Sequence, residues 1–334
     1  MPAALNRGHA YRDRVTADES GQPLSAVYAS RHAHSGVVVW RQRLAAGEIC
    51  RNGRQLRADV ALAAGDQLVW HRPPWQEAAV PVLPGPLFDD GDLLVFNKPS
   101  GLPVLPAGGF LEHTVLAQLQ ARWPGARPVH RLGRFTSGLL VCARSRASRA
   151  WLSALLRQST AAAAPASSWP APARKIYRAL SVPLASDLAA RLELAGALEL
   201  STPIARRPHP LLGRIWCAAT PGDASDPGDR SDPAGLSARS LLSLVEQRPG
   251  ASLLELAIAS GRPHQIRIHC AAAGAPLLGD PLYGPGGLAR ADALPGDGGY
   301  HLHAHRLQLP LADGTLLEFE APLPEVLRAA AERG

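Results

Sequence analysis

The hydrophobic positions of the chain change between helix-like and strand-like spacing several times, without a regular strand–helix–strand repeat. Near the N-terminus the spacing over residues 40–44 is helical. Residues 47–53 then alternate and end in Asn-Gly, the pair favoured in two-residue hairpin turns. A second short strand is expected at 66–70, after a turn at Gly65. These elements predict a small α+β module over residues 1–80.

Beyond this module the pattern predicts a larger domain over residues 88–328. Prolines recur from 73 to 86 and predict a stiff connector, which we place at 81–87. Short apolar runs and helical periodicity predict strands at 92–96, 138–143 and 253–258, and helices at 115–123, from 145 onward and at 264–273. Because the strands and helices do not alternate regularly, we predict an α+β fold whose mixed, mainly antiparallel sheet is flanked by helices.

Two segments of this domain have a different composition. Residues at about 159–173 are rich in Ala, Pro and Ser, and residues at about 220–236 carry four Asp among Pro and Gly. Such segments bury little apolar surface, so both are expected to be flexible insertions.

Composition excludes several classes of protein. Hydrophobic residues make up 46% and charged residues 19%, which permits a sizeable core and excludes global disorder. No apolar run approaches the ~18–20 residues of a membrane-spanning helix, and the first residues lack an apolar signal core. The four Cys lie far apart with no CxxC pair, which argues against a disulfide framework or a thiolate zinc site. We therefore expect a cytoplasmic protein that does not enter the membrane.

Three histidines that alternate along a predicted strand, His301, His303 and His305, raise the question of a metal site. No cysteine or carboxylate ligand lies beside them in the sequence. We therefore favour a partly exposed strand and predict no bound metal.

The positive charge is concentrated in one part of the chain. The formal net charge is +7, and only two of the 35 basic residues are lysines. Residues 121–180 contain ten arginines and one lysine but no Asp or Glu. Guanidinium groups match phosphate oxygens and stay charged, so this stretch favours a nucleic-acid partner. A GC-rich genome would also raise the arginine content, so charge alone leaves the partner open.

Three dense polar segments carry the most informative pattern: 129–141, 175–180 and 260–269, the last followed by 277–284. Together with 88–103, 302–304 and 318–324 they resemble the RluA-type RNA pseudouridine synthase family, which isomerises uridine in ribosomal or transfer RNA. The resemblance covers about residues 86–328. Over 47–53 and 65–66 the N-terminal module is similar to the small RNA-binding module of ribosomal protein S-four.

The resemblance implies a site and a reaction. In this family an Asp acts at the ribose as nucleophile or base, a Tyr stacks on the base, and a basic residue pairs with the Asp. By motif, Tyr177 holds the place of the Tyr and Arg262 that of the basic residue. Residues expected to contact RNA are His130, Arg131, Arg134, Lys98, Lys175, His264 and Arg267. The family needs neither metal nor organic cofactor, and we expect an RNA-binding monomer.

The sequence departs from the family at the central position. The family loop reads His-Arg-Leu-Asp-Arg, whereas residues 130–134 read His-Arg-Leu-Gly-Arg, so that Gly133 replaces the catalytic Asp. Glycine can neither attack nor take a proton, and losing a central nucleophile commonly costs about 10⁴–10⁶ in rate. One alternative is that this position needs a glycine because its φ is positive.

The basic residue at 262 then needs another partner. Another acid approaches it, or the pocket is wet, or RNA phosphate pairs with it. The acids considered are Asp280, Asp89, Asp90 and Asp92. Asp280 belongs to a Gly-Asp-Pro turn, where capping of that turn is the simpler role.

Three functions follow from these observations. The first is an RNA pseudouridine synthase with residual, unconventional or rescued catalysis. The second is an RNA-binding or RNA-folding paralogue that has lost turnover. The third is a protein-interaction scaffold with a basic surface. The presence of Tyr177, Arg262 and the His-Gln-Ile-Arg segment favours an RNA cleft over a scaffold. The sequence therefore predicts the family and leaves the turnover in question.

Overall fold

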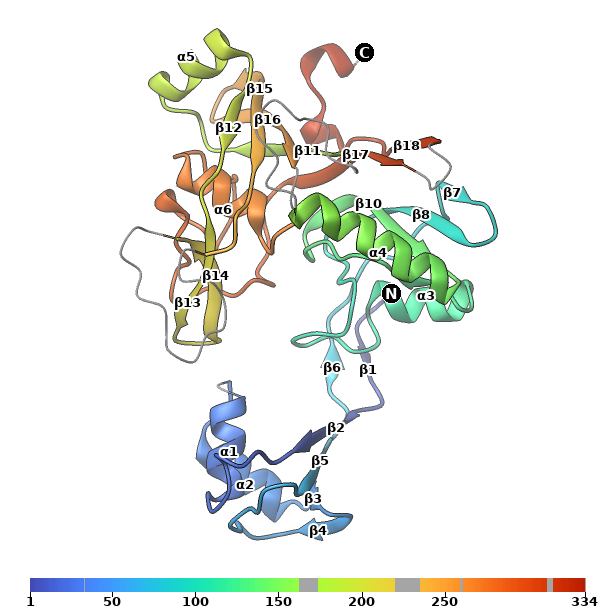
Figure 1. The fold of residues 1–334 in the computed structure, drawn as a ribbon, viewed down its shortest axis with the longest axis vertical. Coiled ribbons are helices and arrows are strands. Elements are labelled where there is room, and N and C mark those ends of the chain that lie inside the picture. The colour runs from blue at the N-terminus through green and yellow to red at the C-terminus, as the bar shows by residue number, and fades with distance from the viewer. Residues whose placement is uncertain (33, 162–173, 220–234, 259–260, 311–314, 334) are drawn as a thin grey trace. The chain divides into compact units, whose positions relative to one another are not determined.

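The computed structural model describes residues 1–32, 34–161, 174–219, 235–258, 261–310 and 315–333 (Figure 1). Contacts within the chain divide it into two compact units. The large unit consists of Met1, Val80–Arg207 and Arg214–Gly334, and the small unit of Pro2–Ala79 and Pro208–Gly213. None of the helices in the described residues is long and apolar enough to cross a bilayer.

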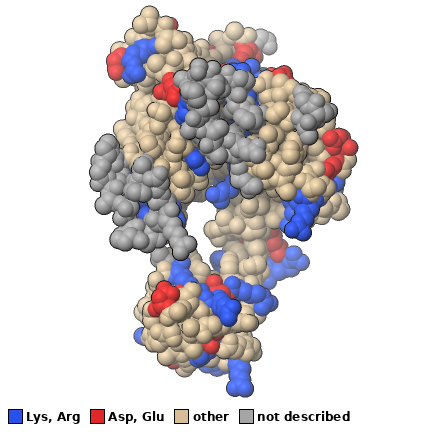
Figure 2. Space-filling model, in the orientation of Figure 1, with Lys and Arg blue, Asp and Glu red and all other residues tan. Residues whose placement is uncertain are grey.

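The small unit contains a four-stranded antiparallel sheet and two helices. The strand order is β2 (His9–Arg14), β5 (Gln67–Arg72), β3 (Ile49–Arg51) and β4 (Arg54–Leu56). The helices are α1 (Leu24–Arg31) and α2 (Val37–Ala45). A separate ribbon pairs β1 (Ala4–Leu5) with β6 (Gln76–Glu77). On the face shown in Figure 2, basic side chains of this unit outnumber acidic ones.

Local chemistry explains why the small unit folds in this way. Asn52 and Gly53 have φ of 50° and 80°, so the predicted hairpin turn joins β3 to β4. Trp40 of α2 is fully buried, with its ring centroid 4.6 Å from that of Tyr28 on α1 and 4.8 Å from that of Trp70 on β5. These three aromatic rings form the centre of the core of this unit.

The large unit is built on one long sheet. Its main path runs, in spatial order, through β12 (Leu198–Leu200), β15 (Ser240–Arg248), β16 (Ala251–Ile258), β11 (Arg174–Ser181), β17 (Leu302–Pro310), β10 (Thr136–Ala143), β8 (Leu93–Lys98) and β7 (Phe88–Asp89). β18 (Leu316–Glu320) pairs with β17, and β9 (Arg127–Pro128) pairs with β10. Except for β10 with β17, the strand pairs of this sheet are antiparallel within the described residues, which confirms the predicted fold class.

Helices bury the apolar faces of the sheet in two main clusters. α3 (Val115–Arg122) and α4 (Arg146–Ala161) pack against β8 and β10. α5 (Ser186–Ala195) and α6 (Gln265–Ala272) pack against β15 and β16. The remaining elements are a ribbon of β13 (Ile204–His209) and β14 (Gly213–Ala218), with 3₁₀ turns at Pro285–Gly287, Glu325–Leu327 and Ala330–Glu332.

The single parallel pairing brings two distant segments together. Gly138 of β10 lies opposite Ala304 of β17 and has φ of 101°. A Cβ at this position would overlap the backbone of Ala304, so only glycine permits the close approach. As a result, the loop before β10 and the residues before β17 lie at the same end of the sheet.

Some sequence predictions are corrected here. His303 and His305 are 1% and 5% exposed, so this strand is buried there and not partly exposed. Ser137 and the backbone oxygen of Ala321 provide partners for their rings. Of the expected insertions, 162–173 and 220–234 lie outside the described residues, whereas 159–161 end α4 and Leu236 forms a bridge with Ile204.

Candidate active site

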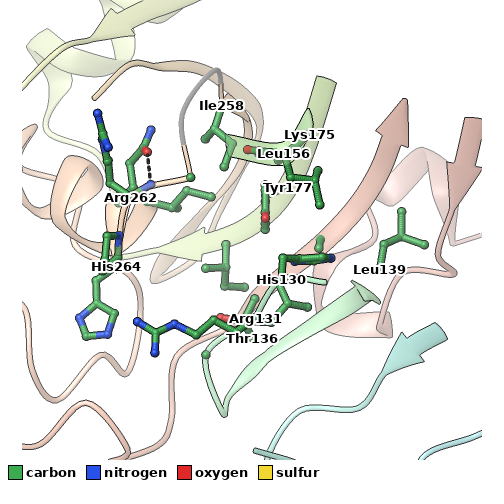
Figure 3. A pocket seen from close by; sticks show the side chains of 18 of the residues that line it. His130, Arg131, Thr136, Leu139, Leu156, Lys175, Tyr177, Ile258, Arg262 and His264 are labelled. Carbon is green, nitrogen blue, oxygen red and sulfur yellow. Dashed lines mark hydrogen bonds between the residues drawn. The ribbon is translucent and has the colours of Figure 1, made fainter. Parts of the chain in front are cut away.

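The large unit contains a pocket of about 450 Å³ where the motif segments meet (Figure 3). Its walls come from the loop before β10, strand β11, the segment that leads into α6, and the start of β17. Five cationic residues line it: Arg131, Lys175, Arg262, Arg267 and Arg306. Within the described part of the chain, no Asp or Glu lines it. The pocket therefore has a positively charged wall.

β11 contributes two residues because alternate side chains of a strand point to the same face. Tyr177 is half-buried, and burial raises the pKa of its phenol to about 12, so the group stays neutral at pH 7. The ammonium of Lys175 donates a hydrogen bond of 3.2 Å to the backbone oxygen of Leu156. Burial lowers the pKa of Lys175 to about 8. One strand thus provides an aromatic ring and an ammonium group that loses its proton as the pH rises through about 8.

The loop before β10 contributes a neutral histidine and an arginine. His130 accepts a hydrogen bond of 3.0 Å through Nε2 from the backbone N–H of Val141. Burial, with the charge of Lys175 second, lowers the pKa of His130 to about 3, so its imidazole is uncharged. Arg131 is exposed, and its guanidinium points toward His264 (Figure 3).

The segment before α6 contributes Arg262 and His264. Arg262 donates from Nε to the backbone oxygen of Ser237 at 3.0 Å, and Gln265 accepts its backbone N–H at 3.1 Å. His264 has φ of 57°, a left-handed conformation that is uncommon outside glycine, and its Nδ1 lies 2.6 Å from the Tyr283 hydroxyl. Burial, then Arg267, lowers the pKa of His264 to about 3. Such backbone strain is common in functional sites.

Arg267 is already paired inside the protein. It donates two hydrogen bonds of 2.7 Å to the carboxylate of Asp280, and the side chains of both residues are almost fully buried. Asp280 also accepts the backbone N–H groups of Leu282 and Tyr283. Asp280 therefore caps its turn and neutralises Arg267, and it does not line the pocket.

The other acids considered from the sequence are also engaged elsewhere. Asp89 pairs with Arg144. Asp90 accepts the backbone N–H groups of residues 92 and 93, and Asp92 accepts hydrogen bonds from Ser145 and Ser148. None of the three lines the pocket.

The structure explains the glycine at 133 sterically. Gly133 is not among the residues with positive φ, so the conformational explanation is wrong. A Cβ at this position would lie 2.7 Å from the Tyr300 hydroxyl and 3.2 Å from the Thr136 Oγ1. Real Cβ atoms essentially never come within 3.0 Å of another heavy atom in this way. A side chain at position 133 therefore requires the Tyr300 hydroxyl to move from its place.

Two residues expected to contact RNA do not line the pocket. Lys98 is fully buried, and its ammonium donates to the backbone oxygens of Pro99, Leu102 and Arg134 at 2.9, 2.9 and 3.0 Å. Arg134 donates to the backbone oxygen of Gly101, and its guanidinium lies over Phe110 and Phe135. Both cations hold the loops that surround the pocket.

Outside the His-Gln-Ile-Arg segment, four polar lining residues had not been singled out from the sequence: Thr136, Ser153, Tyr300 and Arg306. A signal existed for Tyr300, because it is one of only five tyrosines and lies just before the Leu302-His-Ala segment. Arg306 gave no such signal; in the structure its guanidinium pairs with Glu255 of β16, two strands away in the sheet.

Comparison with known proteins places this site in a family. Residues 92–272 match the family model described as RNA pseudouridylate synthase. The chain belongs to this family. An uncharacterised RNA pseudouridine synthase of Synechocystis sp. is 39% identical over 90% of this chain and 94% of that protein. RNA pseudouridine synthase 5 of Arabidopsis thaliana is 34% identical over 98% of this chain and 96% of its own length.

A solved structure shows the same fold. Human RNA pseudouridylate synthase domain containing 4 has a TM-score of 0.52 at 22% identity, over 73% of this chain and 90% of its own. The resemblance to RluA-type pseudouridine synthases is thereby confirmed, and the chain is an RNA pseudouridine synthase by family. The family reaction breaks the bond between uracil and ribose, turns the base over, and rejoins it through C5.

Proposed function

We propose that this protein converts uridine to pseudouridine in structured RNA, rRNA or tRNA, in the pocket of the large unit. The observation that carries the proposal is that Tyr177, Arg131 and Arg262, which lie far apart in the sequence, line one pocket of about 450 Å³. This volume lies in the range of pockets that hold a small molecule or a single nucleotide. The neutral phenol of Tyr177 suits stacking on the uncharged uracil base, and the cations beside it suit pairing with the negatively charged RNA backbone.

The roles follow from the environment of each side chain. An enzyme that acts on a base takes it out of the stack, and an aromatic ring can replace the lost stacking. Tyr177 is the ring available for this. Arg131, Arg262 and Lys175 bind phosphates or ribose oxygens around the flipped nucleotide. In the small unit, the exposed Arg54 and Arg57 on and beside β4 suit contact with RNA away from the target base.

A second candidate function is supported by a separate observation. Within the described residues, no carboxylate lines the pocket. A protein that binds and remodels RNA without turnover needs the cations of this pocket but no acid–base group. The alternative is therefore an RNA-binding paralogue or RNA chaperone.

One experiment separates the two functions. Rejoining through C5 removes the hydrogen from that carbon, so RNA labelled with tritium at uracil C5 releases tritium into water only on turnover. RNA isolated from a strain that lacks the gene is the substrate, because it holds the unmodified target. The expected result is stoichiometric release, together with a pseudouridine that disappears on deletion and returns with the unaltered gene.

Two results decide against the proposal. Binding of the same RNA without any tritium release supports the RNA-binding alternative. An unchanged pseudouridine map after deletion does the same. Tyr177→Leu is the matched negative control, because it removes the ring and keeps an apolar side chain on β11.

The proposal includes a monomer in the cytoplasm. Its support is that the motif segments of the pocket all come from one chain and that the proposed substrates are cellular rRNA or tRNA. Light scattering and cell fractionation test the two points, and a dimer or a membrane-bound pool contradicts them.

A further inference from the structure

The Tyr300 hydroxyl lies where a side chain at position 133 would begin. It is 2.7 Å from the position of a Cβ on Gly133, and it is 3.3 Å from the Thr136 Oγ1. Both Tyr300 and Gly133 line the pocket. The pairing of β10 with β17 produces this meeting, because Thr136 lies opposite Leu302.

Only one atom of Tyr300 causes the conflict. After the hydroxyl and Thr136 Oγ1, the next atom near that Cβ position is Thr136 Cβ, at 4.0 Å. The ring carbons of Tyr300 are no closer than this. A phenylalanine at 300 would therefore leave room for a side chain at 133. The glycine at 133 and the phenolic oxygen of Tyr300 are therefore linked, because the oxygen occupies the space that a Cβ at 133 would need.

The ring of Tyr300 is held in a charged environment. The residue is 3% exposed, and the Arg267 guanidinium lies 4.3 Å from its ring centroid. The same guanidinium lies 5.0 Å from the ring centroid of Tyr283, and its two hydrogen bonds to Asp280 fix its orientation. The ring of Tyr300 is therefore held in one position beside a buried ion pair.

We propose that the Tyr300 hydroxyl is the acid–base group of this pocket and acts at the ribose from the place that Gly133 leaves free. The inference rests on the proposed function, turnover of uridine in RNA. Because the hydroxyl is fixed by the sheet and by Arg267, it needs no rearrangement to face a nucleotide in the pocket.

Tyr300 is the only acid–base group of the protein that the reaction needs, and water exchanges the remaining protons. Ionised Tyr300 takes the proton from C2′, the C2′–H pair forms a C1′=C2′ double bond, and the C1′–N1 pair leaves on N1 of uracil. After the base turns over, the phenol returns its proton to C2′, and C5 of the uracil anion attacks the cationic C1′. The C5 hydrogen then leaves as a proton, and N1 takes up a proton from water. The product is an isomer of the substrate.

The mechanism predicts a distinctive pH dependence. A phenol accepts a proton as a base only when it is ionised, so a tyrosine base predicts a rate that rises with pH. A carboxylate is already ionised at pH 6.5 and above, so a carboxylate base predicts a flat rate. The charged and titratable groups around Tyr300 are Arg267 and Tyr283, with Asp280 bound to Arg267. The charge of Lys175 also changes with pH and affects RNA binding. The rate is therefore measured at saturating RNA concentration, where binding does not limit it.

The first test removes only the oxygen. Tyr300→Phe should lower the single-turnover rate of tritium release by about 10²–10⁴-fold, the usual contribution of general acid–base catalysis. RNA affinity should stay within about threefold. Tyr28→Phe is the control, since it removes the phenolic oxygen of a buried tyrosine in the small unit that does not line the pocket. Its rate should stay within about threefold of the wild type.

The second test moves the acid–base group to position 133. Gly133→Asp alone should lower Tm and turnover, because its Cβ overlaps the Tyr300 hydroxyl. Gly133→Asp combined with Tyr300→Phe should recover Tm and raise turnover at least tenfold above Tyr300→Phe. The wild-type rate should rise from pH 6.5 to 8.5, whereas that of the double variant should be flat.

Two results overturn the inference. If Tyr300→Phe turns over like the wild type, the hydroxyl has no acid–base role, while the proposed function stands. If the wild type releases no tritium from RNA that it binds, both the inference and the proposed function fail. A wild-type rate that is flat over this pH range also overturns the role of Tyr300.

Discussion

The Lys98 ammonium donates a hydrogen bond of 3.0 Å to the backbone oxygen of Arg134, 36 residues further along the chain. Two more backbone oxygens, of Pro99 and Leu102, complete its coordination. Burial, then the charge of Arg134, lowers the pKa of Lys98 to about 7. One buried amino group therefore joins the loop after β8 to the loop that holds Gly133. The position of the pocket loop depends on a residue that does not reach the pocket.

Lys98→Met should destabilise the fold without changing the RNA surface. Three oxygens lose their donor, and a buried polar group without a partner costs ~1–3 kcal/mol, so the free energy of unfolding should fall by about 3 kcal/mol or more. Urea unfolding followed by circular dichroism measures this. The exposed Arg146→Met is the control and should change stability by less than ~0.5 kcal/mol. If Lys98→Met left the stability unchanged and weakened RNA binding, Lys98 would contact RNA, as the sequence predicted.

Lys175 should make RNA binding dependent on pH. Burial lowers the pKa of its ammonium to about 8, so the charge is present below pH 8 and is lost as the pH rises. From pH 7 to 9 the affinity should fall, and the slope of log K against log salt should shrink by about one phosphate contact. Fluorescence anisotropy at several salt concentrations measures both. Lys175→Arg should keep the slope at pH 9. A slope equal at the two pH values in the wild type would contradict the prediction.

Arg131 should contribute to RNA binding and not to folding. It is exposed, and within the described residues no hydrogen bond or ion pair engages its guanidinium. Arg131→Gln should weaken RNA binding across sequences and reduce the salt slope by about one, because phosphate contacts carry little sequence information. The midpoint of urea unfolding should not move. Arg146→Gln is a control for the loss of one positive surface charge. If both variants weakened binding equally, the effect would come from the overall positive charge of the protein and not from a contact of Arg131.

Asp280→Asn should destabilise the large unit. Removing one partner of a buried ion pair costs ~3–5 kcal/mol, because the other charge remains buried. Thermal unfolding measures the loss, and Asp90→Asn, at a turn on the surface, is a control with a smaller effect. If Asp280→Asn instead kept its stability and lost turnover, Asp280 would be the catalytic acid after all.

The sequence predicted features that depend on neighbouring residues. Asn52-Gly53 specifies a turn through its own backbone preferences, and the helix expected at 115–123 is present as α3, at Val115–Arg122. The long motifs also identified the family, because their residues recur in order along the chain. The motifs thereby predicted that Tyr177, Arg262 and Arg131 share one site, and all three line the pocket.

Features that depend on distant contacts were missed. Lys98 is part of a dense polar motif, and its sequence does not show that three carbonyl oxygens surround it. Gly133 was explained by backbone conformation, because its real constraint, the Tyr300 hydroxyl, lies far along the chain. Only the parallel pairing of β10 with β17 brings these two residues together.

That pairing also determines when the pocket can exist during synthesis. β17 lies between β11 and β10, so without it the sheet consists of two separate halves. Its residues, Leu302–Pro310, leave the ribosome after every other strand of the sheet except β18. Contacts over such long sequence separations form late, because the intervening chain must first be closed into a loop. We therefore expect the nascent chain to carry its basic surface early and to acquire a uridine pocket only when its last tenth has been made.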